Sequence, residues 1–416
     1  MNPDEVLRIV DQIHLDRKID KEIVFIGIEQ ALLVAARKHA GEEANIVVHI
    51  DRQTGEIAAF RDNVPLPPTE IAERIGAQTA KQVMIQKIRE AERDAIFDSY
   101  MEMLDQMVSG VVHRNEGALT VVALPNVDAI LPRAEKIPGE NCRVGDRIYA
   151  MIVDVKKSGT KVKVILSRIR PMLVQRLFEQ EIPEIAEGII EIKGISREPG
   201  HRSKIAVSCS DPRIDTVGAC VGVRGARIRN VVDELSGERI DVVPWSSDML
   251  VFIPRALQPA VVDEVILCAM LGRAIVLVQK DQRSLAIGRK GQNVRLASKL
   301  SGWDIEIMLR EELETLLTTA LEQFSSIEGV DRDLADRLVG EGFLSYDDLS
   351  IIEPDDLMEM GGLSAETADA IVAVAEERAE EEEARKAALA ADSDRDENGG
   401  VQTEESSFRG DGPAEE

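Results

Sequence analysis

One pattern occurs twice in this sequence, and it constrains the fold more than any other feature. The copies lie at 219–243 and 284–308, and each contains a Gly-x-x-Gly tetrapeptide, GVRG at 222–225 and GRKG at 288–291. An amphipathic helical pattern, a Leu-Ser-Gly end and a short alternating strand follow in both copies. The tetrapeptides are 66 residues apart, a spacing that is typical of a duplicated small domain and too long for a solenoid repeat.

The residue types in this pattern point to a polyanionic ligand. The glycines let the backbone approach a ligand closely, and the start of the following helix offers unpaired N–H groups and a positive dipole end. Both loops also carry cations. A basic Gly-x-x-Gly that starts a helix is typical of a KH domain, which holds about four single-stranded nucleotides. The candidate RNA-binding residues are Gly222, Val223, Arg224, Gly225, Arg227, Arg229, Gly288, Arg289, Lys290, Gly291, Asn293 and Arg295.

The alternative is a glycine-rich helix start that only packs on a sheet, but it leaves the basic character of both copies unexplained. The charge distribution also favours a polyanion. The chain has a net charge of −26, yet residues 311–416 contain 32 acidic and 7 basic residues, whereas residues 201–310 contain 12 acidic and 16 basic ones. Because electrostatic fields are screened beyond about 8 Å at physiological salt, binding follows the local basic charge.

Several function classes are disfavoured. No apolar run is long enough to span a membrane, and the acidic N-terminus lacks the order of a signal peptide, so we expect a cytoplasmic protein without membrane contact. The four cysteines, Cys142, Cys209, Cys220 and Cys268, form no Cys-x-x-Cys pair. We therefore expect no metal site, no cofactor and no disulfide framework. No nucleophile–base pair is evident in residues 1–108, so we predict no catalytic residue.

The first 170 residues predict a helical domain followed by a small barrel. Helical spacing at 3–14 and 21–39 precedes a β-hairpin with strands at 46–50 and 57–60, and a long charged helix is expected at 78–108. Five alternating segments at 111–113, 119–124, 127–131, 147–155 and 161–166 predict a closed barrel of the OB type. Its many basic residues are consistent with a nucleic-acid groove, or they serve only solubility. Tyr149 and His113 are the candidates for base stacking.

Further elements are expected around the two Gly-x-x-Gly loops, which we call the clamps, and beyond them. A short helix at 173–178 and strands at 188–195 and 204–208 precede the first clamp, and strands at 250–254, 261–267 and 274–279 lie between the clamps. Two glycine turns, at 326–330 and 360–363, predict a helix-hairpin-helix domain. Residues 311–375 contain 17 acidic and 2 basic residues, so a protein partner is favoured over DNA there. The acidic tail should begin as helix and end disordered.

This order of domains resembles the bacterial NusA family of transcription termination and antitermination factors. The resemblance rests on segments 77–83 and 89–93 of the long helix, and on 211–222 and 286–303 around the clamps, and it covers about residues 1–310. It implies that the N-terminal domain contacts RNA polymerase beside the RNA exit channel. It also implies that the barrel and KH modules hold nascent single-stranded RNA, and that other Nus-type elongation factors are partners.

The predicted fold class is multidomain α+β. The expected domains are a polymerase-binding domain at 1–108, an S1-type OB barrel at 109–170, KH domains at 171–246 and 247–310, an acidic helix-hairpin-helix domain at 311–383 and a disordered acidic tail at 384–416. The predicted function is a non-enzymatic, monomeric RNA-binding elongation factor that modulates pausing, termination and antitermination. The alternatives are an RNA-processing enzyme of the exoribonuclease type, or an RNA-binding adaptor whose acidic end competes for its own KH modules.

Overall fold

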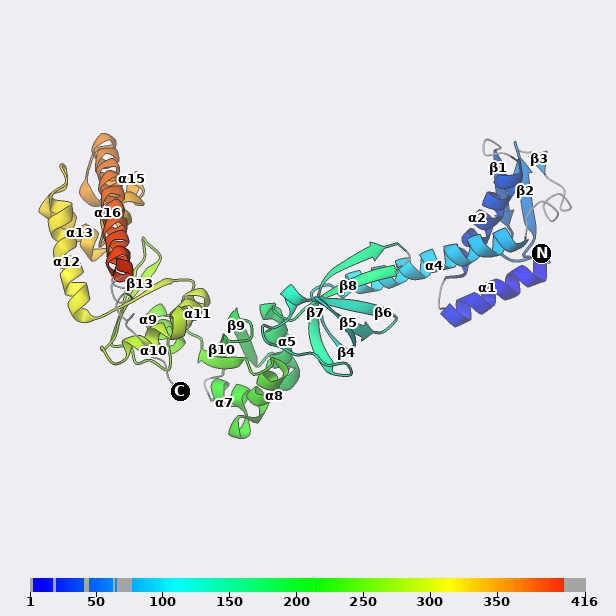
Figure 1. Cartoon of the computed structure of the whole chain (residues 1–416), viewed down its shortest axis with the longest axis horizontal. Coiled ribbons are helices and arrows are strands. Elements are labelled where there is room, and N and C mark those ends of the chain that lie inside the picture. Colours follow the sequence, from blue (N-terminus) through cyan, green and yellow to red (C-terminus); the bar gives the residue numbers. More distant parts are fainter. Residues whose placement is uncertain are drawn as a thin grey trace, which may run out of the picture. The chain divides into compact units, whose positions relative to one another are not determined.

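In the N-terminal domain, two helices pack on a small sheet (Figure 1). The computed structural model describes residues 3–17, 20–40, 45–62, 64–65, 77–159, 161–211 and 213–399. The helices are α1 (Pro3–Arg17) and α2 (Lys21–Ala40), and the strands are β1 (Ile46–Ile50), β2 (Ile57–Arg61) and β3 (Val64–Pro65). The predicted hairpin is confirmed, with Val48 opposite Ala59. The apolar faces of both helices and of the sheet form one core, against which Ile88 of the next helix packs.

The long helix α4 (Ala77–Glu102) joins two hydrophobic cores. Its first half contacts the N-terminal core, and Tyr100 near its end is buried in the core of the barrel that follows. The prediction that this helix reaches residue 108 is wrong. Asp105 has φ 57°, a left-handed conformation that helices do not continue through, and Met107 already begins strand β4. The end of α4 is therefore part of the barrel fold.

The barrel is closed and has five strands, as predicted, and the strand order is β4-β5-β6-β8-β7. The strands are β4 (Met107–Glu116), β5 (Leu119–Leu124), β6 (Val127–Pro132), β7 (Arg147–Ser158) and β8 (Lys161–Ser167), and a short 3-10 helix, η1 (Arg133–Glu135), follows β6. Alternate residues of each strand point inward, such as Val122 in β5 and Val164 in β8. The outward residues of β8 include Lys161 and Lys163.

Both repeats of the sequence fold into a three-stranded sheet with helices. The first KH module contains α5 (Pro171–Glu181), α6 (Pro183–Ala186), β9 (Ile190–Glu198), β10 (Arg202–Cys209), α7 (Thr216–Val221), η2 (Val223–Gly225), α8 (Ala226–Glu234) and β11 (Arg239–Pro244), with sheet order β11-β10-β9. The second contains α9 (Met249–Ala256), β12 (Glu264–Cys268), β13 (Arg273–Leu277), α10 (Arg283–Ile287), η3 (Arg289–Gly291), α11 (Gln292–Ser301) and β14 (Asp304–Met308). In its sheet, β13 pairs antiparallel with β12 and parallel with β14.

One strand prediction between the clamps is wrong. Residues 250–254 lie in helix α9, whose N-cap Asp248 accepts a hydrogen bond from the Leu250 N–H. A short apolar run carries no periodicity that separates a strand from a buried helix, and the capping aspartate decides between them here. Phe252 and Ile253 then pack in the core of the second KH module.

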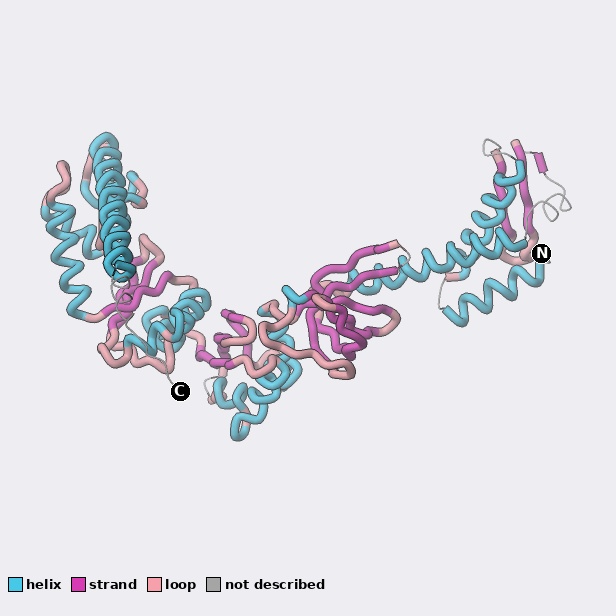
Figure 2. Tube along the Cα trace, in the orientation of Figure 1, coloured by secondary structure: helices cyan, strands magenta, loops and turns pink. Residues whose placement is uncertain are grey.

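The C-terminal part is helical (Figure 2), with α12 (Arg310–Ser325), α13 (Arg332–Gly340), α14 (Tyr346–Ser350), α15 (Pro354–Gly361) and α16 (Ala365–Gly399). The two predicted hairpin turns lie between α12 and α13 and between α15 and α16, where Gly329 and Gly362 have positive φ. The tail begins as helix, as expected, and residues 400–416 lie outside the described residues. The chain divides into two compact units, 1–192 with 197–203 and 209–241, and 193–196 with 204–208 and 242–416.

Candidate nucleic-acid interface

The first Gly-x-x-Gly loop, which we call clamp 1 (residues 222–225), links α7 to α8. Gly222 has φ 74° and ψ 174°, and Gly225 has φ 73°. Arg224 between them has φ 54°, in the left-handed region that residues other than glycine rarely adopt. Val223 is 84% exposed and Arg224 is also exposed. The loop therefore holds one cation at its exposed tip in a backbone conformation that the neighbouring glycines make possible.

The second loop, clamp 2 (residues 288–291), links α10 to α11 with the same backbone. Gly288 has φ 75° and ψ 173°, Lys290 has φ 54° and Gly291 has φ 72°. Arg289 and Lys290 are both exposed. Because Gly288, Lys290 and Gly291 repeat the conformation of their counterparts in clamp 1, the sequence repeat is also a structural repeat. Clamp 2 differs in carrying two cations where clamp 1 carries one.

The helix behind each clamp begins without a side-chain cap. The N-cap residue is Gly225 for α8 and Gly291 for α11, and neither helix start has a side-chain capping hydrogen bond. Uncapped helix starts present N–H donors and the positive end of the helix dipole. With the exposed cations beside them, these starts form a geometry that suits a phosphate group.

The first glycine of each clamp is required by close packing as well as by its φ angle. A Cβ on Gly222 would lie 2.8 Å from Cγ of Arg227, and a Cβ on Gly288 would lie 2.7 Å from Cβ of Asn293 and 2.9 Å from its backbone nitrogen. A Cβ on Gly291 would meet no atom within 4 Å. The last glycine of clamp 2 therefore serves its backbone conformation alone.

Arg227 and Asn293, predicted as RNA-binding donors, are engaged in holding the loops. Both lie five residues after the first glycine of their clamp. Arg227 donates from Nη1 to the Ala219 carbonyl (2.7 Å) and to the Glu184 carboxylate (2.9 Å). Asn293 is fully buried, and its Nδ2 donates to the carbonyl of Leu257 (2.8 Å) and those of two α10 residues. Each side chain thus ties the helix after the clamp to the helix before it.

The remaining two candidates lie on the outer face of the same helices. Arg229 and Arg295 occupy the seventh position after the first glycine, and both are exposed. The guanidinium of Arg295 donates to the carbonyl of Lys290 at 3.4 Å, which keeps it next to clamp 2. The cations that face solvent at the clamps are therefore Arg224, Arg229, Arg289, Lys290 and Arg295.

The tyrosine of the barrel contacts the first KH module. Tyr149, the predicted stacking residue, is half-buried, and its hydroxyl accepts a hydrogen bond from Gln180 of α5 at 3.1 Å. Its backbone N–H donates to Glu234 at the end of α8. Tyr149 therefore belongs to the contact between the barrel and the first KH module. His113 is exposed on β4, 4.0 Å from an Asp128 oxygen.

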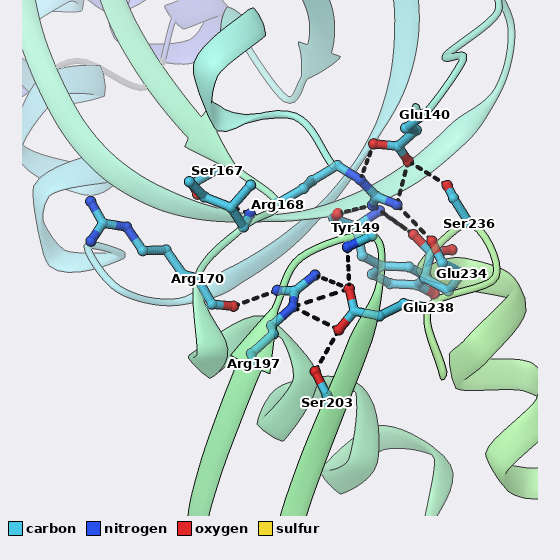
Figure 3. A network of polar contacts seen from close by, with 12 residues as sticks. Glu140, Tyr149, Ser167, Arg168, Arg170, Arg197, Ser203, Glu234, Ser236 and Glu238 are labelled. Atoms are coloured by element: carbon cyan, nitrogen blue, oxygen red, sulfur yellow. Dashed lines mark hydrogen bonds and ion pairs between the residues drawn. The ribbon is translucent and has the colours of Figure 1, made fainter. Parts of the chain in front are cut away.

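That contact is built around the buried Arg168, and a second buried arginine, Arg197, lies beside it within the first KH module (Figure 3). The Arg168 side chain is 1% exposed and forms ion pairs with Glu140 (2.7 Å) and with Glu234 (2.8 Å). Arg197 and Glu238, both fully buried, pair at 2.9 Å. Helix α8 is consequently fixed at both ends, at its start by Arg227 and at its end through Glu234. This network could not be predicted from the sequence, because an arginine after a strand is usually solvent-exposed.

The described residues show neither a metal site nor a membrane span. Within them, no group of three or more His, Cys, Asp or Glu side chains could hold a metal ion. No helix there is long and apolar enough to cross a bilayer. The buried thiols of Cys142, Cys220 and Cys268 have raised pKa values, mainly because burial disfavours the charged thiolate; for Cys220 the pKa is raised to about 11.

Four family models match the chain and agree with the observed modules. Residues 5–66 match the NusA N-terminal domain, residues 168–245 the NusA-like first KH domain, and residues 249–315 the NusA-like second KH domain. Residues 321–377 match the SAM-like helix-hairpin-helix tandem. Both clamps fall inside KH models, so the interpretation of the repeated Gly-x-x-Gly pattern as tandem KH domains is confirmed.

Curated relatives match over most of the chain. A protein named "Transcription termination/antitermination protein NusA" from Rickettsia prowazekii (strain Madrid E) is 36% identical over 403 residues, which cover 88% of this chain and 80% of that protein. The protein of the same name from Rickettsia conorii (strain ATCC VR-613 / Malish 7) is 36% identical, and the match covers 88% of this chain and 80% of that protein. The one from Bacillus subtilis (strain 168) is 38% identical over 335 residues, 73% of this chain and 90% of that protein. The chain therefore belongs to the NusA family.

Proposed function

We propose that this protein is an RNA-binding transcription factor that acts in termination and antitermination by holding nascent single-stranded RNA on its two KH clamps. The observation that carries the proposal is the repeated clamp geometry: at each site an exposed cation with positive φ precedes an uncapped helix start. The names of the relatives support the process, and the exposed cations support the ligand. The acting residues are Arg224, Arg289 and Lys290, with Arg229 and Arg295 beside them. In this proposal the protein is cytoplasmic and monomeric, and it needs no cofactor.

The N-terminal domain provides the surface for RNA polymerase in this proposal. On the sheet face that points away from the domain core, Val47 lies opposite Phe60 in the β1–β2 register. Val47 is 55% exposed and Phe60 is 36% exposed. Adjacent exposed apolar side chains on one sheet mark a candidate protein-interaction surface. We expect the double substitution of Val47 and Phe60 by Glu to abolish co-purification of RNA polymerase with the full chain.

Transcription in vitro tests the complete proposal. Purified RNA polymerase on a template with a hairpin terminator is assayed with the wild-type chain and with the variant Arg224→Asn, Arg289→Gln, Lys290→Asn. We expect the wild-type chain to change pausing and termination at the hairpin, and the variant to lose that effect while still co-purifying with polymerase. Equal effects of both proteins would refute a role for the clamps.

The enzymatic alternative is tested with the same materials. Labelled RNA incubated with the full chain, Mg²⁺ and inorganic phosphate should keep its length if the protein only binds RNA. Progressive shortening of the RNA at a rate that rises with the concentration of the protein would favour the exoribonuclease interpretation and overturn the proposed non-enzymatic role.

A further inference from the structure

The end of the barrel holds the end of helix α8, the helix that begins at clamp 1 (Figure 3). Glu234 is the last residue of this helix, and Arg168 follows the last barrel strand, β8. The Arg168 guanidinium donates to the backbone carbonyl of Glu234 at 2.6 Å and to its carboxylate at 2.8 Å. A cation at this position satisfies a carbonyl at the helix end and complements the negative end of the helix dipole. Arg168 therefore caps the helix of clamp 1.

The barrel in turn fixes the geometry of Arg168. The side chain is 1% exposed, and Glu140 pairs with it at 2.7 Å. The backbone of Tyr149 on β7 contributes twice: its carbonyl accepts from the guanidinium, and its N–H donates to the Glu234 carboxylate at 3.1 Å. Glu140 also accepts a hydrogen bond at 3.2 Å from Ser236, just after α8. Because every nitrogen of the guanidinium has an acceptor, the end of α8 is fixed relative to the barrel.

The start of α8 is tied to its own module. Arg227 bonds to Glu184 of α6, and farther along the helix the Asn230 amide donates to Glu181 of α5 at 2.7 Å. The helix has nine residues, so it is about 13 Å long and moves as one rigid rod. Supports at both ends of a rod fix its direction, and this direction sets where the N–H groups at Gly225 point. The orientation of clamp 1 therefore depends on the barrel as well as on the KH module.

Helix α11, which begins at clamp 2, is supported differently. At its start the buried Asn293 donates to the carbonyl of Leu257, at the end of α9, at 2.8 Å. At its end Gly302 has φ 76° and donates its N–H to the Ser298 carbonyl at 2.8 Å. The Ser298 hydroxyl then donates to the Trp303 carbonyl at 2.7 Å. These supports come from the second KH module itself, so the two clamps share a backbone conformation but differ in what holds their helices.

We propose that Arg168 and Glu234 are positioning residues for clamp 1. Through them the barrel sets the direction of α8, so that phosphate binding at clamp 1 depends on the contact between the barrel and the first KH module, whereas clamp 2 is self-supporting. This inference rests on the proposed function, since it assumes that clamp 1 binds RNA. It deepens that function by making the two clamps unequal in what their activity requires.

The first test measures RNA affinity of the full chain at several salt concentrations for Glu234→Ala. This change leaves no buried charge unpaired, because Arg168 keeps its ion pair with Glu140. If clamp 1 then loses one phosphate contact, the slope of log affinity against log salt should fall by about 0.7, and binding at ~0.15 M salt should weaken about fourfold. Glu234→Gln keeps an acceptor oxygen for Arg168 and for the β7 backbone, so it should retain most of the wild-type affinity.

A matched control and a stronger variant complete this series. Asp241 pairs with Arg202 on the sheet of the same module at 2.7 Å, and its side chain is 30% exposed, against 22% for Glu234. Asp241→Ala should therefore keep the wild-type slope although it also removes a half-buried ion pair. The double variant Glu140→Gln, Arg168→Met removes the cap of α8 without leaving a charge at residue 140, and it should give the same loss as Glu234→Ala or a larger one.

Double variants separate positioning from a general loss of stability. In a background of Arg224→Asn with Arg229→Gln, which removes the exposed cations of clamp 1, Glu234→Ala should cause no further loss of RNA affinity. In a background of Arg289→Gln with Lys290→Asn, which neutralises clamp 2, it should cause the same loss as in the wild type. A change that only destabilised the protein would weaken RNA binding in both backgrounds.

The amide resonances of the clamp glycines give a second readout in the RNA-free chain. Glu234→Ala should shift those of Gly222 and Gly225 and leave those of Gly288 and Gly291 in place. Equal losses of affinity in both backgrounds, or an unchanged affinity and slope in Glu234→Ala and in the double variant, would overturn the inference. The proposed function would survive either result as long as the clamp substitutions themselves weaken RNA binding, and it would fail if they do not.

Discussion

Neutralising the three clamp-tip cations is the most direct test of how this protein holds RNA. The variant Arg224→Asn, Arg289→Gln, Lys290→Asn keeps the loops intact, because asparagine tolerates the left-handed φ of 54° that Arg224 and Lys290 adopt. If each cation contacts one phosphate of a single strand, the slope of log affinity against log salt should fall by about 2. At ~0.15 M salt this corresponds to a roughly fiftyfold weaker affinity.

Fluorescence anisotropy with a labelled single-stranded RNA between about 0.05 and 0.3 M salt measures both quantities. The matched control replaces three exposed arginines of the N-terminal and acidic domains, Arg8, Arg61 and Arg332, by glutamine, which gives the same net charge. We expect the control to bind nearly as the wild type does, because local charge governs binding. A clamp variant with unchanged affinity and slope and an unchanged circular dichroism spectrum would refute the assignment of RNA binding to the clamps.

Three further changes test the packing behind the clamps and the acidic domain. Gly288→Ala should destabilise the second KH module by about 1–3 kcal/mol in urea denaturation, because its Cβ would lie 2.7 Å from Cβ of Asn293 at a φ of +75°. Gly342→Ala should lower the free energy of unfolding by about 1–3 kcal/mol, since the Cβ of the new alanine would lie 2.1 Å from Sγ of Cys268. The double variant that also carries Cys268→Gly should recover part of this lost stability. The pKa of Glu184 is lowered by a hydrogen bond from its own backbone N–H and by Arg227. The contribution of this carboxylate to stability is therefore present above the ordinary pKa of about 4.5 and is lost as pH falls through the lower pKa of the folded state. The amide resonances of clamp 1 should shift below about pH 4.5, whereas those of clamp 2, which is held by the amide side chain of Asn293, should stay in place.

The clamps could be predicted from the sequence because their determinants are local. Glycine positions, a basic centre and an amphipathic helix pattern specify the loop within a few residues, and the same combination occurs twice. The roles of Arg227 and Asn293 could not be predicted in this way. Each role depends on a hydrogen bond to a carbonyl of the preceding helix. The sequence alone does not distinguish a side chain that donates such a bond from one that is exposed and available to a ligand. Their shared position, five residues after the first glycine, is the one signal that was available.

Other errors have different physical origins. The apolar run at 250–254 forms a helix because Asp248 caps it, and a five-residue run cannot establish its own periodicity. Arg168 follows a strand, where a charged residue usually faces solvent, yet the structure buries it between two carboxylates. A local cap decides the first case, and pairing with carboxylates distant in the sequence decides the second. The closed barrel was predictable because five alternating strands in one short segment leave few other arrangements.

The acidic domain bears on the adaptor alternative, in which the acidic end competes with RNA for the KH modules. Alternate residues of β13 face opposite sides of its sheet. Ala274 and Val276 pack with the helices that carry clamp 2, whereas Ile275 and Leu277 lie in the core of the acidic domain. The acidic domain therefore covers the sheet face opposite the clamp helices. Arg273 of β13 fixes it there by an ion pair of 2.7 Å with a buried aspartate of α14.

Truncation after residue 309 should therefore unfold the second KH module and should not tighten RNA binding. Removing the acidic domain exposes Ile275, Leu277 and Met308, and each buried side chain of this size contributes about 1.5–3 kcal/mol. Their sum, about 5–9 kcal/mol, equals much of the stability of a typical domain. We expect loss of cooperative unfolding in urea and faster hydrogen exchange in β13, with weaker RNA binding. A truncated chain that stays folded and binds RNA more tightly at low salt would contradict this reasoning and favour competition, because only a detachable acidic domain can mask the clamps.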